Sequence, residues 1–147
     1  MLEIVSTDGK LLAIFISAAY QSGKTSFLTP DCEPIQIGLG HYGQGAMVVP
    51  HSHVGIPASV TEFQEFIQVR RGRVIADVFD TNDHFVRSFE MLPGDSLFLL
   101  RGGHGFHFVE DTEFLELKQG PYLGREKMKR PLVNAPLSFR SESRTSP

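Results

Sequence analysis

GAMVVPHSH, residues Gly45 to His53, is an apolar run that ends in two histidines separated by one residue. Side chains at positions i and i+2 of a β-strand point to the same face, so His51 and His53 would share one face of a strand. Neutral imidazole is a common ligand of transition metals, and two imidazoles on one face can hold one ion. The segment therefore predicts a strand over Ala46–His53 that carries two metal ligands.

Short strand-like segments separated by turn signals make up most of the remaining chain. Asp8-Gly9 is typical of a hairpin turn. In Pro93-Gly94-Asp95, proline fixes φ and glycine accepts a positive φ, which favours a turn. Many short strands at regular spacing indicate an all-β sandwich or barrel, here an antiparallel one in a single domain. The other expected strands are Leu2–Val5, Leu11–Ala18, Phe27–Thr29, Ile35–Leu39, Phe63–Arg71, Arg73–Asp80, His84–Leu92, Ser96–Leu100, Gly105–Val109 and Glu113–Gln119.

Length and composition narrow the class of protein. The 147 residues suffice for one domain with its own core. A formal net charge of −3 argues against general nucleic-acid binding. Cys32 is the one cysteine, the N-terminus lacks the pattern of a signal peptide, and no apolar run is long enough to span a membrane. We expect a cytoplasmic protein with a β-barrel over residues 1–119 and a C-terminal extension over 120–147 that is partly disordered at its end.

Two spaced motifs resemble those of the cupin superfamily. Gly45, five residues and His51-Ser52-His53 match the front of the first cupin motif, and Glu65, six residues and Gly72 match its back. Gly94-Asp95 and the segment from Arg101 to Phe106, which contains His104, resemble the second motif. The resemblance covers roughly residues 35–119. It implies a small antiparallel β-barrel or jelly roll that binds one divalent transition metal (Fe, Mn, Ni, Co or Zn). By the resemblance, the ligands are His51, His53, Glu65 and His104.

Strand parity bears on the choice of the carboxylate. Eleven residues separate His53 from Glu65, a longer spacer than the family has, so Glu62 remains an alternative ligand. In a strand over Glu65–Arg71, Glu65 shares a face with Ile67 and Val69, which is the more apolar face. Glu62 has the opposite parity unless a bulge intervenes, so parity favours Glu65.

The same reasoning applies to the two histidines near the second motif. His104 shares a face with Phe106 and Phe108, whereas His107 points to the other face. Parity therefore favours His104 as the ligand, and a bulge in this strand would reverse the choice.

Three further residues are candidates for acid–base catalysis. Glu116 and Lys118 share one face of the last strand and could either form an ion pair on an exposed edge or contact a substrate at the mouth of the barrel. Glu62 is the third candidate. The resemblance implies a metal-dependent enzyme acting on a small polar molecule, with a slight preference for carbohydrates. The reaction would be isomerisation or epimerisation of a sugar or keto compound, or dioxygenation. A non-catalytic module that binds or senses a small ligand is the alternative.

A homodimer is expected as well. Cupin-like barrels pair through sheet edges or exchanged N-terminal strands, and exposed strand edges favour such pairing. The apolar segment Leu11–Ile16 is the candidate for the dimer interface.

Overall fold

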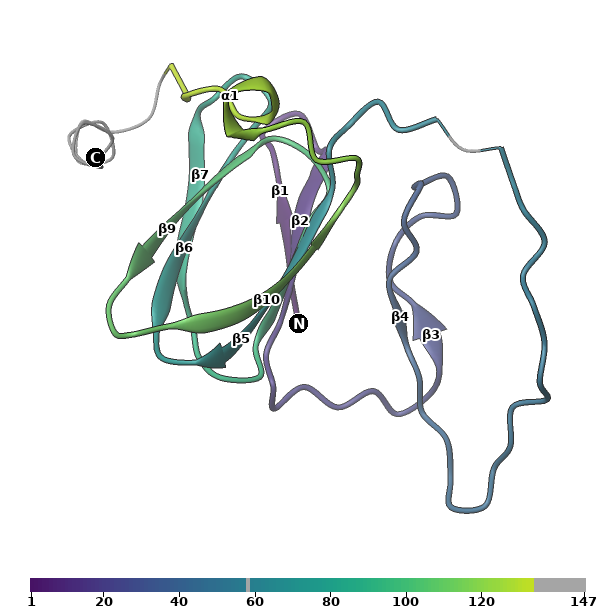
Figure 1. Cartoon of the computed structure of the whole chain (residues 1–147). Coiled ribbons are helices and arrows are strands. Elements are labelled where there is room, and N and C mark those ends of the chain that lie inside the picture. The colour runs from purple at the N-terminus through teal and green to yellow at the C-terminus, as the bar shows by residue number, and fades with distance from the viewer. Residues whose placement is uncertain (58, 134–147) are drawn as a thin grey trace. The chain divides into compact units, whose positions relative to one another are not determined.

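The computed structural model of the chain describes all residues except 58 and 134–147 (Figure 1). The chain divides into two compact units. One comprises Met1–Ala18 and the chain from Glu62 onward, and the other comprises Ala19–Thr61. The two units are described separately below.

Eight strands of the larger unit form two antiparallel sheets (Figure 1). In the five-stranded sheet the order is β1 (Leu2–Val5), β2 (Leu11–Ile16), β8 (Ser96–Leu99), β5 (Glu65–Arg71) and β10 (Glu113–Lys118). In the three-stranded sheet the order is β7 (Phe85–Met91), β6 (Val74–Phe79) and β9 (Gly103–Phe108). A short helix, α1 (Arg125–Met128), follows β10. The smaller unit contains β3 (Ser26–Phe27) paired with β4 (Gly38–Leu39).

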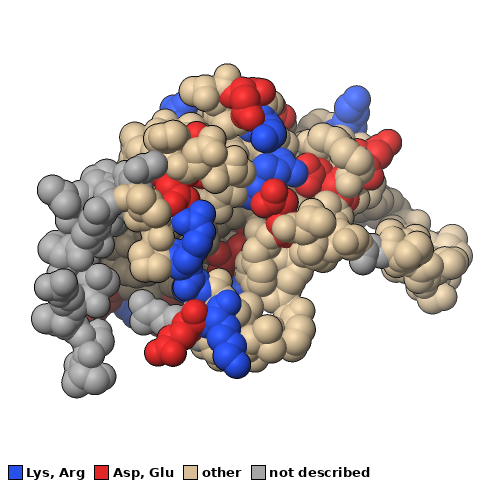
Figure 2. Space-filling view, turned by 90° about the horizontal axis from the view of Figure 1, so that it is seen from above, with Lys and Arg blue, Asp and Glu red and all other residues tan. Residues whose placement is uncertain are grey.

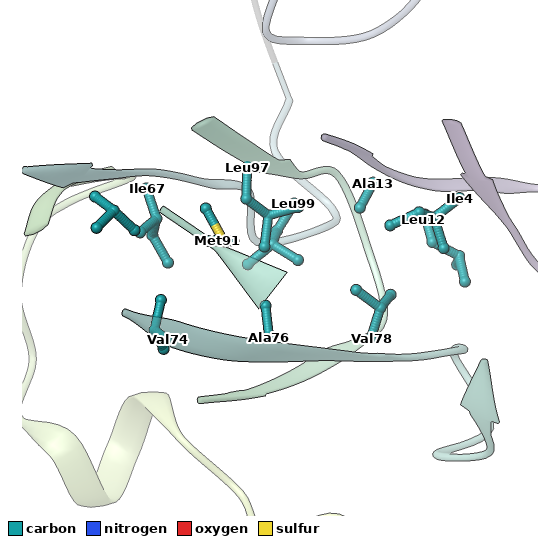
Figure 3. Packing of buried hydrophobic residues seen from close by; sticks show 11 residues of the cluster. Ile4, Leu12, Ala13, Ile67, Val74, Ala76, Val78, Met91, Leu97 and Leu99 are labelled. Atoms are coloured by element: carbon teal, nitrogen blue, oxygen red, sulfur yellow. The ribbon is translucent and has the colours of Figure 1, made fainter. Parts of the chain in front are cut away.

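The apolar core lies between the two sheets of the larger unit. Val74, Ala76 and Val78 alternate along β6 and face side chains of the five-stranded sheet, among them Ile67 and Leu97 (Figure 3). All five are at most 3% exposed. Their spacing of two residues follows from the strand period, which places alternate side chains on one face. Burial of such side chains is the main contribution to the stability of this unit.

A β-bulge sets the register of the outermost strand of the larger sheet. Glu113 of β10 pairs with Arg71, but the next residue, Phe114, pairs with Val69, so Arg70 has no partner across the strand. From that point onward Glu116 is opposite Ile67 and Lys118 is opposite Glu65. Because residues directly opposite each other share a face, these two charged residues of β10 face the interior. Leu115 and Leu117 face outward and are 50% and 67% exposed.

The prediction of an all-β antiparallel fold is confirmed, but the prediction of a closed barrel is wrong. Among the residues that the structure describes, β10 pairs only with β5 and β9 pairs only with β6, so no hydrogen-bonded ladder joins the two sheets at this side. The larger unit is therefore a pair of open sheets. β2 lies between β1 and β8, so Leu11–Ile16 is not an edge of this sheet, and the dimer interface expected there stays a prediction.

Eight of the ten other expected strands match strands of the larger unit in outline. Phe27–Thr29 and Ile35–Leu39 overlap only the two-residue strands β3 and β4. The predicted strand over Ala46–His53 does not form. Pro50 cannot donate a ladder hydrogen bond, and Gly45 has a positive φ of 82° that turns the chain just before it. Met47 and Val49 are 90% and 77% exposed, so this apolar run does not pack as a half-buried strand would.

Among the described residues, the helices are too short or too polar to cross a lipid bilayer.

Candidate functional site

Glu65 and His104 lie together in the interior of the larger unit, although they belong to different sheets. Nε2 of His104 is 3.1 Å from Oε2 of Glu65. The Glu65 side chain is 7% exposed and that of His104 is 28% exposed. His104 is opposite Val78 of β6, whose side chain is fully buried, so the imidazole faces inward. Both orientations agree with the expectation from strand parity.

Lys118 and Glu116 extend this group along β10. Nζ of Lys118 lies 3.6 Å from Oε1 of Glu65 and also forms an ion pair with Glu116. The two side chains are about one quarter exposed, at 27% and 29%. The structure therefore brings four polar groups together: two carboxylates, one ammonium and one imidazole. The ion pair that the sequence suggested is present on β10, the last strand in the order of this sheet, whereas contact with a substrate stays a prediction.

Burial controls the protonation of His104. Loss of solvent around the imidazole lowers its pKa from 6.5 to about 4, and the positive charges of Lys129 and Lys118 act in the same direction. His104 is therefore neutral at pH 7, and a neutral imidazole with its proton on Nε2 can donate that hydrogen to Glu65. In that form its other ring nitrogen, Nδ1, carries no proton.

A glycine immediately before β9 determines where His104 is placed. Gly102 has φ 81°, which disfavours other residues, and a Cβ at this position would lie 2.3 Å from the carbonyl oxygen of Phe79. The close approach allows Gly103 to pair with Phe79 at the start of β9. The two glycines before His104 thus allow β9 to begin close to Phe79, a role that the sequence motif alone did not indicate.

His51 and His53 belong to the smaller unit, in an irregular and exposed segment. Their ring centroids are 5.1 Å apart, so the two imidazoles remain neighbours even though the expected strand is absent. Nδ1 of His51 is 2.8 Å from the carbonyl oxygen of Val49. In its neutral form this nitrogen can donate to the carbonyl, which leaves Nε2 as an acceptor.

The described residues contain no group of three or more His, Cys, Asp or Glu side chains arranged around a common metal position. Glu65 and His104 are together, and His51 and His53 are together, each pair within its own unit. Glu62, the alternative carboxylate, is exposed. The predicted ligand set therefore stays a prediction.

The C-terminal extension contributes contacts that the sequence did not indicate. Both guanidinium nitrogens of Arg130 donate to Asp83, at 2.7 and 2.8 Å. The backbone N–H of Val133 donates to the same carboxylate at 3.0 Å. Arg130 and this N–H hold the pKa of Asp83 at about 2, well below its usual range. We call Lys129–Val133 the C-terminal strap. The end of the extension, predicted to be disordered, lies outside the described residues.

The strap follows α1 and contacts the turn between β6 and β7. Figure 1 shows the chain running from β10 past α1 across the upper end of this unit. Figure 2, seen from above, shows Lys and Arg side chains alternating with Asp and Glu side chains rather than gathering by sign. The charged groups visible in that view therefore act as individual pairs more than as one charged surface.

Comparisons with protein-family models, with curated proteins and with solved structures find no match to this chain. The case for a function therefore rests on the geometry of the residues.

Proposed function

We propose that the chain is a cupin-like protein that binds one divalent transition metal through His51, His53, Glu65 and His104 and uses it on a small polar molecule. The observation that supports this most is the position of Glu65 beside His104. A carboxylate and a neutral imidazole, both facing inward from different sheets, are the kinds of donor that Fe, Mn, Ni, Co and Zn accept.

The distance between the two donors fits a shared metal ion. Two atoms that each bind one ion at about 2.1 Å would lie at most about 4.2 Å from each other. Nε2 of His104 and Oε2 of Glu65 are 3.1 Å apart. The same distance suits a direct hydrogen bond, so the pair is compatible with both the metal-free and the metal-bound protein.

The proposal assigns the remaining ligands to the smaller unit. The neighbouring rings of His51 and His53 offer two imidazole donors from one short segment. Three histidines and one carboxylate would leave coordination positions open for a substrate, as a catalytic site needs. In that site the metal supplies Lewis acidity, or binds dioxygen if it is Fe(II).

Two charged residues beside the ligands favour an enzyme over a passive binding module. Lys118 contacts Glu65 directly, and Glu116 contacts Lys118. A carboxylate and an ammonium within reach of a bound molecule can accept and return a proton, as isomerisation or epimerisation of a sugar or keto compound requires. Glu62, the third candidate, is exposed and has no assigned part in this arrangement.

A non-catalytic module that binds or senses a small ligand is the second candidate. The ion pairs of Lys118 favour it, because an ammonium that contacts two carboxylates balances their charges and can have a structural role without taking part in a reaction. Under either function we propose a cytoplasmic homodimer.

Metal analysis of untagged protein tests the proposal. We expect about one divalent transition metal per chain, retained through gel filtration and removed by a chelator. A screen of sugars, keto compounds and dioxygen-dependent substrates with the metal-loaded protein then separates the two candidates. Turnover that disappears in Glu116→Gln while metal content stays constant supports the enzyme. Binding without turnover supports the module, and protein free of metal after growth in metal-supplemented medium contradicts both.

A further inference from the structure

Three phenylalanine side chains lie on the inner faces of β9 and β10. Phe106 and Phe108 belong to β9, and Phe114 belongs to β10. The residues directly opposite them on the neighbouring strands are all buried core residues: Ala76, Val74 and Val69. Because residues directly opposite each other share a face of the sheet, the three rings point into the space between the two sheets.

We call Phe106, Phe108 and Phe114 the aromatic cluster. Their ring centroids lie 6.1 to 6.5 Å apart, within the range of aromatic contacts, and the rings of Phe108 and Phe114 are parallel to within 4°. The contacts of Phe114 with the other two rings cross the side of the larger unit where, in the described part of the chain, no ladder joins β9 to β10. Side chains rather than backbone hydrogen bonds therefore connect these two strands.

The aromatic cluster is open to solvent although it faces inward. Phe108 is 50% exposed and Phe114 is 38% exposed, whereas Phe106 is partly buried and packs against the core. A phenylalanine side chain has no polar atom, so covering these rings removes apolar surface from water and breaks no hydrogen bond. The two exposed rings are therefore available to a further apolar group.

The aromatic cluster is continuous with the polar group described above. The ring centroids of His104 and Phe106 are 5.3 Å apart, His104 contacts Glu65 at 3.1 Å, and Lys118 contacts Glu65 at 3.6 Å. Small-molecule sites combine mostly apolar and aromatic walls with a few polar groups that orient the ligand. The inner faces of β9 and β10 have this composition, with aromatic side chains at one end and polar side chains at the other.

We propose that the aromatic cluster binds a planar aromatic ring of the small molecule that occupies this site. The ring packs against Phe108 and Phe114, and a hydroxyl group on it is directed to the polar end. A phenolic hydroxyl can donate to a carboxylate and accept from an ammonium, and Glu65 and Lys118 provide both.

The inference rests on the proposed function for the position of the reacting end and adds the class of ligand: a phenol-like molecule. A sugar suits the aromatic end less well. Its hydroxyl groups would lose water there, and phenylalanine side chains offer them no hydrogen bond in return. Flat rings, in contrast, pack favourably against other flat rings in stacked or edge-to-face arrangements.

Nuclear magnetic resonance titration of the full chain with phenol tests the inference, in chelator-treated and in metal-loaded protein. We expect saturable shifts of the ring resonances of Phe108 and Phe114, and nuclear Overhauser effects between their ring protons and those of phenol. Cyclohexanol keeps the hydroxyl group without the flat ring and should bind more weakly, as should glucose. The inference is overturned if phenol causes no saturable shift at these rings, or if cyclohexanol or glucose binds as tightly as phenol.

Phe108→Leu and Phe114→Leu test the assigned residues. Each removes a ring and keeps an apolar side chain, so the fold should be retained, with circular dichroism as the check. Each should weaken phenol binding by about threefold or more. Phe85→Leu is the matched control, because Phe85 is also 50% exposed and its ring contacts that of Phe79, outside the aromatic cluster. Phenol binding that neither variant weakens, or that Phe85→Leu weakens as much, overturns the inference.

The two proposals fail separately. Metal-loaded protein that does not bind phenol contradicts the inference and leaves the metal site standing. Protein that binds phenol through Phe108 and Phe114 but holds no metal contradicts the metal site and leaves the aromatic site standing.

Discussion

Nε2 of His104, in the three-stranded sheet, lies 3.1 Å from Oε2 of Glu65, in the five-stranded sheet. The two sheets are not joined by a hydrogen-bonded ladder at this side, so this contact and its neighbours connect β9 to β5. A polar contact at such a junction depends on both sheets at once. Changes to either partner should therefore affect ligand binding more than the folding of either sheet.

The first prediction concerns the metal ligands. His51→Ala, His53→Ala and His104→Ala should each lose most of the bound metal, because each removes one of few donors. Glu65→Gln should lose less, since an amide oxygen can still coordinate. Metal content per chain after gel filtration, with circular dichroism as the check on folding, measures this. His107→Ala should keep its metal. A metal-free His107→Ala protein together with a loaded His104→Ala protein would show that the assigned ligand is wrong.

The second prediction concerns stability against pH in chelator-treated protein. The pKa of His104 is about 4 in the folded chain and about 6.5 when exposed, so the unfolded chain takes up the proton first as pH falls. The free energy of unfolding should thus decrease between pH 6.5 and 4, by up to about 2 kcal/mol at pH 5. The nearby Glu65 carboxylate reduces this amount. Urea unfolding of wild type and His104→Gln at pH 7 and pH 5 provides the comparison, and equal losses in both proteins would rule out His104 as the cause.

The third prediction concerns the C-terminal strap. Asp83→Asn removes the charge that pairs with Arg130, so the strap should detach more often. Trypsin should then cut faster after Lys127 and Lys129, as followed by mass spectrometry. Asp111→Asn changes an exposed carboxylate elsewhere in this unit and should leave the cutting rate unchanged. Equal rates in wild type and Asp83→Asn would show that this contact does not hold the strap.

The fourth prediction compares leucines on the two faces of the larger sheet. Leu97 is fully buried in the core, so Leu97→Ala should lower the free energy of unfolding by about 2–5 kcal/mol. Leu115 is half exposed, and Leu115→Ala should change the free energy of unfolding by less than about 0.5 kcal/mol. Urea unfolding monitored by circular dichroism measures both. Similar effects at the two positions would mean that the assigned faces are incorrect.

The fifth prediction is a dimer by sedimentation velocity at micromolar concentration. Because β2 is internal, the free edges of the larger sheet are β1 and β10. β10 carries the exposed Leu115 and Leu117, so Leu117→Glu should weaken a dimer formed at that edge. A monomeric wild-type protein would contradict the prediction, and a dimer unaffected by Leu117→Glu would place the interface elsewhere.

Local sequence patterns predicted the strands and the direction of their side chains well. The alternation from Glu65 to Val69 and from His104 to Phe108 identified the inward faces, because the period of two is a property of the strand itself. The strand predicted over Ala46–His53 is absent, although this segment has the apolar composition of a strand. Pairing depends on distant residues, which a local pattern does not contain.

Local sequence patterns did not predict the contacts between residues that are far apart in the chain. The Arg130–Asp83 pair joins residues that are far apart in sequence and that lie in segments expected to be a turn and a tail. Single charged residues in such segments are usually solvated, so the sequence did not distinguish Arg130 and Asp83 from other charged surface residues. The bidentate contact arises only once the turn and the strap lie side by side.

The unpaired Arg70 has a wider consequence. If Arg70 instead paired with Phe114, so that the ladder continued without a bulge, every residue of β10 beyond Glu113 would pair one position away from its present partner and its side chain would exchange faces. Leu115 and Leu117 would then enter the core, and Glu116 and Lys118 would leave it. Such a strand would bury more apolar surface, but Lys118 would no longer be opposite Glu65. The unpaired position of Arg70 thus goes together with the inward direction of Glu116 and Lys118. Deletion of Arg70 itself would close the bulge and leave the pairs Glu116–Ile67 and Lys118–Glu65 as they are, so both charged side chains should still face inward.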